Sequence, residues 1–197
     1  MVILRAYRPD DLDALYRICL ETGDAGRDAT PLHNDPLLLG HIYSAPYGAL
    51  EPDHVFVAED EDGVAGYIVG THDSERFSQK LEAAWWPELR QVYAHASGMT
   101  HTDQSRIASI MQPNGSPTEL MEPYPAHIHM NLLPRLRGQR VGTKLLNLWI
   151  DQARSAGVRG IHLGASATNE GGIAFWSRSG FTRLPLGGGA VWFGMSL

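Results

Sequence analysis

One stretch of this chain combines a strand, a glycine-bearing turn and an amphipathic helix. Residues 125–133 (PAHIHMNLL) have the pattern of a strand, residues 137–142 (RGQRVG) supply the turn, and residues 141–154 follow as the helix. The N-terminus of a helix offers free backbone N–H groups and the positive end of the helix dipole. The order therefore predicts an anion site above the turn, and a pyrophosphate suits such a row of donors.

The period of the apolar residues supports the helix, and the spacing of the glycines excludes two known types of phosphate-binding turn. The apolar face recurs at helical intervals, at Val141, Leu145, Leu148, Trp149 and Gln152. The turn is not a P-loop, because Gly138 and Gly142 lie four apart and Thr143 precedes Lys144. The dinucleotide pattern G-x-G-x-x-G is absent as well. A surface turn that merely needs two glycines is the alternative to an anion site.

The turn resembles the acetyl-CoA loop of the GNAT N-acetyltransferases. Arg140 stands where that family usually has a glycine, which keeps the backbone N–H and adds a cation near the phosphates. Residues 169–181 resemble the family's N-x-x-A-x-x-F-Y-x-x-x-G-F segment. The resemblance implies acetyl-CoA as co-substrate, held by Leu132, Leu133, Arg137, Gly138, Gln139, Arg140, Val141, Gly142, Thr143, Asn169, Phe175, Trp176 and Arg178.

The resemblance also implies a fold. Residues 3–11 resemble the family's opening strand and first helix, and residues 55–70 its central hairpin. We therefore expect an α/β GNAT fold, in which helices flank a central, mixed, mostly antiparallel and splayed sheet. We expect one domain over residues 1–197, with residues 72–123 as a helical insertion before the acetyl-CoA-binding strand.

Local patterns place the remaining elements. Apolar spacing and capping signals predict helices at 9–23, 37–42, 75–93 and 102–111, and strands at 161–165 and 193–197. The insertion is interpreted either as a cover for one sheet edge or as a wall of the acceptor pocket or a dimer surface, and these roles are compatible.

Several short segments resemble one GNAT subgroup more closely. They are residues 20–26 (LETGDAG), 28–31 (DATP), 85–87 (WWP) and 127–129 (HIH). They are similar to bacterial proteins that resemble the acetyltransferase-like C-terminal domain of animal O-GlcNAcase. That animal domain has a degraded coenzyme loop, whereas the loop of this chain is intact enough to predict binding.

Composition excludes several classes of protein. With 43% hydrophobic and 19% charged residues the chain is neither disordered nor embedded in a membrane, and no membrane partner is expected. The net charge of −6, with no basic cluster, argues against a nucleic-acid partner. Cys19 is the only cysteine, so a reducing, cytoplasmic location is expected. The sequence is compatible with a homodimer without requiring one.

The candidate catalytic residues are His127, His129, Asn131 and Asp28. The first three alternate along one strand and share a face, where a histidine would accept a proton or be a half-buried hydrogen-bonding residue. Asp28 either binds an acceptor cation or caps a turn. No three histidines occur at the spacing of a metal site, and His127-x-His129 is the only close pair of histidines, so no metal is expected.

Two functions remain open. The resemblance implies direct transfer of an acetyl group to a primary amine, of a small molecule or of a protein, in a ternary complex. Strand residues 131–133 would present backbone N–H groups to the thioester. The family's usual acid is a tyrosine, but Trp176 stands in its place, and an indole N–H does not titrate usefully. The alternative is therefore a catalytically inactive module that binds acetyl-CoA, a pseudo-acetyltransferase. We favour the enzyme.

Overall fold

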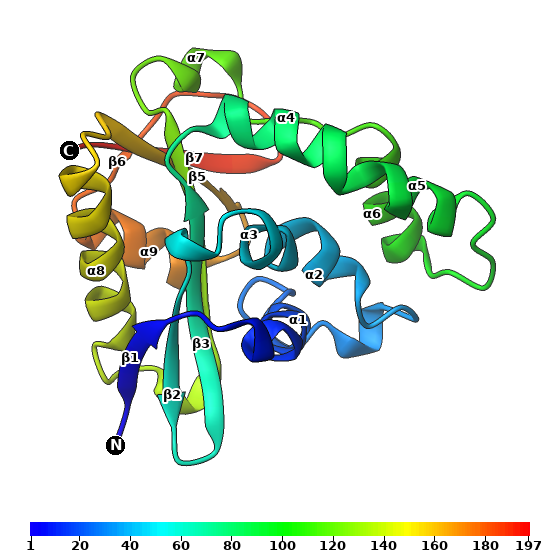
Figure 1. The fold of residues 1–197 in the computed structure, drawn as a ribbon, viewed down its shortest axis with the longest axis horizontal. Helices are drawn as coiled ribbons and strands as arrows, with labels where there is room; N and C mark the ends of the chain where they lie inside the picture. The colour runs from blue at the N-terminus through cyan, green and yellow to red at the C-terminus, as the bar shows by residue number, and fades with distance from the viewer.

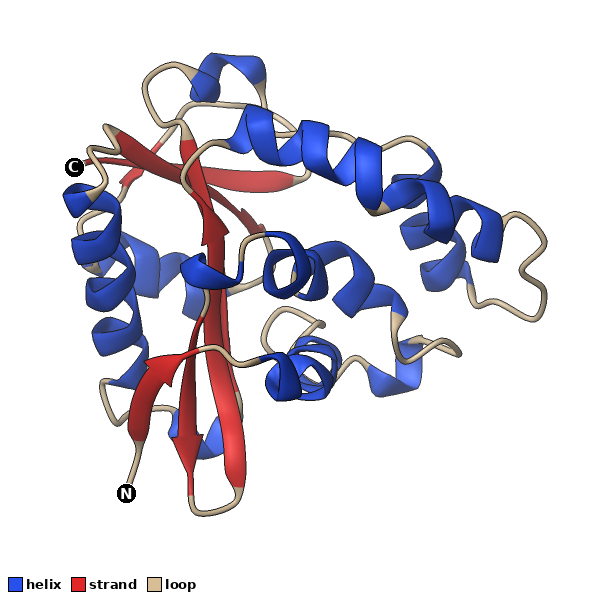
Figure 2. Ribbon diagram, in the orientation of Figure 1, coloured by secondary structure: helices blue, strands red, loops and turns tan.

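The computed structural model describes all 197 residues, as one seven-stranded sheet with helices on both faces. The strands are β1 (Ile3–Ala6), β2 (Phe56–Asp60), β3 (Gly63–Thr71), β4 (Ala126–Leu132), β5 (Gly160–Ser166), β6 (Thr182–Arg183) and β7 (Ala190–Ser196). They lie in the order β1-β2-β3-β4-β5-β7-β6, and only β4 and β5 are parallel. The expected mixed, mostly antiparallel GNAT-type sheet is confirmed (Figure 2).

Nine α-helices accompany the sheet. They are α1 (Leu12–Glu21), α2 (Leu38–Tyr43), α3 (Ala45–Leu50), α4 (Ser74–Ala84), α5 (Trp86–Tyr93), α6 (His101–Met111), α7 (Thr118–Met121), α8 (Val141–Ser155) and α9 (Glu170–Arg178). In Figure 1, α8 and α9 lie on one side of the β2–β3 hairpin and α1, α2 and α3 on the other. Short 3-10 helices at Pro9–Asp11, Thr30–Leu32, Pro52–His54 and Pro134–Leu136 complete the chain.

The main core lies between the sheet and these two helical layers. Its largest fully buried side chains are Trp149 of α8, Tyr67 of β3, Phe77 of α4 and Phe193 of β7. At about 25 cal/mol per Å² of apolar area, such side chains dominate the burial energy. The apolar face predicted for α8 is therefore the buried one, except that Leu148 is exposed. Leu37 and Val92, in the helices expected at 37–42 and 75–93, are exposed as well.

Helices α4, α5 and α6 carry a second, smaller core. It joins Leu38 of α2 to Trp86, Leu89, Tyr93 and Ile110, all of them buried. This core fastens the helices to α2, and in Figure 1 they project away from the sheet beside α2. The interpretation of residues 72–123 as an insertion within a single domain stays a prediction.

The single helix expected over residues 75–93 is wrong. The structure has two helices, because Pro87 lacks an N–H and its ring clashes with a continuing helix, so the chain bends at Trp85. The sequence analysis also missed α3, a short helix that follows α2 after one residue and has Pro46 in its first turn. The last strand begins at Ala190, three residues before its predicted start.

Candidate functional site

The turn before α8 presents an unbroken row of backbone donors. The hydrogen-bond ladder of α8 begins at the Lys144 N–H, which donates to the Arg140 carbonyl at 3.1 Å. The N–H groups of residues 138–143 have no backbone acceptor. Gly138 and Arg140 have φ values of 75° and 59°, and both are exposed. Six free donors at the positive end of a 15-residue helix form a site for an anion.

Gly142 brings this helix start against β4. A Cβ at that position would lie 3.2 Å from the Leu132 side chain, 3.3 Å from Met130 and 3.5 Å from Phe175. The missing side chain lets α8 begin directly over the end of the strand. The anion site therefore lies at the end of β4.

Strands β4 and β5 separate soon after they begin to pair. Their parallel register holds only at Ala126 with Ile161 and His127 with His162, although each strand continues for several residues. The separation is the splay expected from the sequence. A cavity of about 680 Å³ is lined by both strands and by α1, α2, α4 and α6.

The open edge of β4 exposes alternate backbone N–H groups to the gap. The Leu133 N–H donates to the Ala65 carbonyl of the neighbouring chain segment at 2.9 Å. Hydrogen-bonded pairs alternate along an antiparallel ladder, so the backbone N–H of Asn131 also points toward β3. The backbone N–H groups of Met130 and Leu132 therefore point toward the gap. Of the three N–H groups expected at residues 131–133, only that of Leu132 is available, and Met130 adds one that the sequence analysis missed.

His127 is a positioned side chain rather than a free one. The Tyr47 hydroxyl lies 2.7 Å from its Nε2 atom and the Ser74 hydroxyl lies 2.7 Å from its Nδ1 atom. Burial, with smaller effects of His129 and His162, holds its pKa well below the usual range. Both ring nitrogens are therefore occupied, and the ring is neutral.

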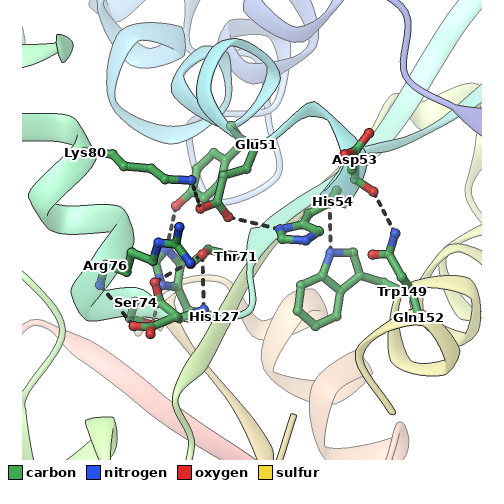
Figure 3. A network of polar contacts seen from close by, with 12 residues as sticks. Glu51, Asp53, His54, Thr71, Ser74, Arg76, Lys80, His127, Trp149 and Gln152 are labelled. Carbon is green, nitrogen blue, oxygen red and sulfur yellow. Dashed lines mark hydrogen bonds and ion pairs between the residues drawn. The ribbon is translucent and has the colours of Figure 1, made fainter. Parts of the chain in front are cut away.

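Further polar contacts continue behind His127 (Figure 3). Burial alone would raise the pKa of the Glu51 carboxyl, but hydrogen bonds from His54 and Lys80 lower it to about 2. The His54 carbonyl accepts a hydrogen bond from the Trp149 indole of α8 at 2.9 Å. These contacts tie the segment around His127 to the helix that begins at the anion site.

His129 is the imidazole that remains free to react. No protein group forms a hydrogen bond with it, and its ring lines the cavity between the rings of Tyr43 and Tyr47, at centroid distances of 5.8 and 5.7 Å. Burial, and secondarily His162, lowers its pKa to about 4. The ring is therefore neutral at pH 7, with nitrogen available to accept a proton.

Asn131 and Asp28 have different surroundings. The Asn131 amide donates to the Thr22 hydroxyl of the segment after α1 at 2.5 Å, and both residues line the cavity. The exposed Asp28 carboxylate accepts from the N–H and hydroxyl of Thr30, which lowers its pKa. It is not among the residues that line the cavity, so the structure favours the turn-capping interpretation of Asp28 over the acceptor-binding one.

Arg137 connects the anion site to the loop after α1. Its guanidinium donates to the Gly26 carbonyl, and its Nη2 atom lies 3.5 Å from the Leu132 carbonyl. Gly26 has a φ of 87°, and a Cβ there would lie 3.8 Å from both Arg137 and Asn169. Three segments distant in sequence therefore meet beside the gap.

The segment that resembles the second family motif forms α9. Asn169 caps this helix by accepting from the Gly172 N–H at 2.9 Å. Trp176 is buried between Phe175 and Phe181, with ring centroids 5.0 and 5.3 Å away in edge-on geometry. Trp176 thus packs as a core side chain and brings no titrating group to the cavity.

The other predicted coenzyme residues surround the helix start. Gln139 donates from its side chain to the Arg135 carbonyl at 2.7 Å. Val141 is buried, whereas Thr143, the last of the six open donors, has an exposed side chain, and Arg178 is exposed at the end of α9. No three His, Cys, Asp or Glu side chains are grouped to hold a metal ion. No helix has both the length and the apolar character needed to cross a membrane.

Sequence reasoning missed Arg106, Ser74 and Thr22 as contributors to the site. All three line the cavity, and the last two hold His127 and Asn131. Arg106 and Ser74 lie on segments outside the motifs quoted above, and Thr22 lies in the segment 20–26 without any sign of its contact with Asn131.

Comparison with known proteins agrees with this geometry. Residues 106–181 match the Acetyltransferase (GNAT) family. The Protein O-GlcNAcase sequences of Rattus norvegicus and Mus musculus are each 25% identical over 180 residues, covering 90% of this chain and 20% of the relative. The chain thus spans about a fifth of the length of these curated relatives.

Solved structures give the same picture. The protein SsHAT is 33% identical, with a TM-score of 0.91, and the match covers 99% of this chain and 98% of that one. The PaiA N-acetyltransferase of Thermoplasma acidophilum, solved in complex with coenzyme A, is 12% identical with a TM-score of 0.55, covering 100% and 99%. The second likeness concerns the fold alone.

Proposed function

Because this chain belongs to the GNAT acetyltransferase family, we propose that it is an N-acetyltransferase that transfers the acetyl group of acetyl-CoA directly to a primary amine. The observation that carries the proposal is the run of six free backbone N–H groups, at residues 138–143, where a widening gap between two strands ends. These donors suit the pyrophosphate of the coenzyme, with Arg137 and Arg140 as cations beside it.

The gap suits the rest of the co-substrate. The pantetheine arm carries amide groups, and the N–H groups of Met130 and Leu132 offer the kind of pairing that a missing strand would supply. A thioester carbonyl at this edge would have a backbone N–H to stabilise the oxyanion that develops during transfer. The open strand edge therefore has a chemical use.

Transfer in this cavity follows from the groups that line it. The amine nitrogen attacks the thioester carbon, and the C–S bond breaks from the tetrahedral intermediate. His129 accepts the proton of the ammonium in that intermediate, while His127, fixed by Tyr47 and Ser74, keeps the neighbouring face in place. The departing thiolate takes up the proton that His129 has accepted, which gives CoA and returns His129 to its neutral form.

A covalent relay through a cysteine is disfavoured. Cys19 lines the cavity, but it is buried, and burial raises the pKa of its thiol to about 11. Its thiolate is therefore scarce at neutral pH, and the thiol is a poor nucleophile. Direct transfer in a ternary complex needs no such intermediate.

The second candidate is an inactive module that binds acetyl-CoA. Trp176 favours it, because the buried indole cannot replace the family's usual tyrosine as the acid beside the sulfur. Against it stand His129 and the Tyr43 and Tyr47 hydroxyls in the same cavity.

Calorimetric titration with acetyl-CoA, followed by measurement of thiol release in the presence of primary amines, separates the two candidates. The proposal expects micromolar binding together with amine-dependent thiol release. Tight binding with no release for any amine would support the inactive module. Absence of binding would overturn both.

A further inference from the structure

The cavity is almost free of formal charge. Among the residues that line it there is no Asp, Glu or Lys, and Arg106 of α6 is the only arginine. The Tyr43 hydroxyl and ring contact Arg106, and the uncharged side chains of Trp86 and Ser109 line the same cavity. An acidic protein thus encloses a cavity with a single cation.

Arg106 lacks an ionic partner. Its Nη1 atom donates to the Tyr43 hydroxyl at 3.0 Å, its Nε atom is buried without an acceptor, and no carboxylate lies within 4.0 Å of it. The carboxylate of Asp103, one turn earlier in α6, is occupied by His33 at 2.6 Å and by the N–H groups of Asn34 and Thr100. A guanidinium has five N–H donors, so most of the capacity of Arg106 is unused.

Leaving such a group unpaired is costly. A partly buried cation is stable when an anion or several acceptors compensate its lost hydration. The planar fork of an arginine fits a carboxylate or a phosphate through two parallel hydrogen bonds. The cavity therefore lacks one anion, which a ligand would supply.

Arg106 is also fixed at a defined place relative to the reacting groups. Its guanidinium carbon lies 5.7 Å from the centre of the Tyr43 ring, and that centre lies 5.8 Å from the His129 ring. A capping box at Thr100 and Asp103 and the burial of Ile110 beside Trp86 hold α6 in position. One aromatic ring therefore separates the cation from the proposed proton acceptor.

We propose that the acceptor is a small primary amine that carries an anionic group, a carboxylate or a phosphate, and that Arg106 binds this group. The inference rests on the proposed function and names its substrate class. A polyamine or a lysine-rich peptide would bring further positive charge to a cavity that has no carboxylate to receive it. An amino acid or a phosphorylated amine supplies both the nucleophile and the missing anion.

Pairs of amines that differ only in the anionic group test the inference. Phenylalanine is compared with phenylalaninamide and 2-phenylethylamine, and O-phosphoethanolamine with ethanolamine, in thiol release from acetyl-CoA. The anionic member of a pair is expected to have the higher kcat/KM. The pair with the larger preference identifies carboxylate or phosphate as the source of the anion.

Arg106→Gln removes the charge, and Arg106→Lys keeps it as the matched control. The glutamine variant is expected to raise KM for the anionic amines about 10- to 100-fold, well beyond any change in KM for the neutral amines, because a charge-assisted hydrogen bond is lost. The lysine variant is expected to keep part of the preference. Thermal unfolding of each variant checks that the fold is retained.

A binding measurement separates failure of this inference from failure of the proposed function. N-acetylphenylalanine and N-acetyl-O-phosphoethanolamine, the products of the two anionic amines, are titrated into the protein with CoA present. Binding of either that Arg106→Gln abolishes supports the anion subsite even if no amine releases thiol. Equal kcat/KM for the anionic amines in the wild type and in Arg106→Gln overturns the inference and leaves the proposed function standing, as does turnover confined to neutral or cationic amines. Absence of both turnover and binding of either product overturns it as well.

Discussion

The proposed coenzyme end of the site and the proposed acceptor end offer different kinds of group to their ligands. At the proposed coenzyme end, residues 138–143 offer backbone N–H groups, and the side chains around them are mostly exposed. At the proposed acceptor end, in the cavity, the candidate groups are the side chains of His127, His129 and Arg106, whose places are set by contacts between distant segments.

The difference shows which part of the sequence determines each kind of site. A backbone site needs a turn of the right shape, so Gly138, Gly142 and the start of α8 are its main requirements. A side-chain site needs several elements to pack correctly, and it changes whenever one of them moves. The coenzyme end therefore depends on local sequence, and the acceptor end on the whole fold.

The largest effect is expected from Arg137→Glu. The variant breaks the contact with Gly26 and places a negative charge beside the phosphate donors, so acetyl-CoA affinity should fall about 1000-fold. Calorimetry measures it. Arg154→Glu, the same charge change at the far end of α8, is the control and should bind normally. Unchanged affinity of Arg137→Glu would contradict the assignment of the coenzyme end.

The next largest effect is expected from His129→Gln. Loss of a positioned proton acceptor should lower the rate of amine-dependent thiol release about 100-fold while acetyl-CoA affinity is maintained. The exposed His95→Gln is the matched control and should have full activity. If His129→Gln weakens coenzyme binding instead, the two ends of the cavity are not separate.

Acid should destabilise the protein through its buried histidines. Burial lowers the pKa of His72 and of His129 to about 4 and that of His127 well below its usual range. Unfolded histidines bind protons below about pH 6.5, whereas these folded ones do so only at lower pH, so stability is lost as the pH falls from about 6.5 toward 4.

Urea unfolding at pH 7 and pH 5 measures this loss in the free energy of unfolding. We expect a total loss of about 2 kcal/mol, because the rings are partly exposed and solvent reduces the effect. His72→Gln, remote from the cavity, should reduce the pH dependence without affecting turnover. A free energy of unfolding that stays constant between pH 7 and pH 5 would show that these rings titrate normally.

The smallest effect is expected from Arg140→Gly. Arg140 has a left-handed backbone, so glycine should raise the free energy of unfolding by about 1 kcal/mol. Coenzyme affinity should fall less than about tenfold, because the N–H remains and only the cation is lost. Gly138→Ala, at φ 75°, should have the opposite effect on stability. Thermal unfolding and calorimetry measure the two quantities, and a destabilised Arg140→Gly would contradict the strain argument.

The sequence predicted the features that depend on local patterns. The strand before the turn, α8, the β2–β3 hairpin and the family resemblance all follow from periodicity, glycine placement and short motifs. The break at Pro87 was missed because the apolar spacing continues on both sides of it. Pro87 could be identified in the sequence as a helix breaker, but the apolar spacing around it favoured one continuous helix.

The acceptor end was much less predictable. Strand alternation correctly grouped His127, His129 and Asn131 on one face. It did not predict that Tyr47 and Ser74 form hydrogen bonds with His127 and leave His129 without a partner. The sequence did not indicate Arg106 as a binding residue, because a single arginine on an amphipathic helix is common. Its difference is seen only in the fold, where uncharged groups line the cavity around it. The neighbours of these side chains are defined only when α2, α4 and α6 pack together in the fold.

The early separation of β4 from β5 has a consequence for amide hydrogen exchange. Along β4, the N–H groups of His129 and Asn131 belong to the ladder with β3, whereas those of Met130 and Leu132 face the gap. Protection should therefore alternate residue by residue within a single strand. Acetyl-CoA, if bound as proposed, would then act as the eighth strand, and within β4 its binding would slow exchange at Met130 and Leu132 alone.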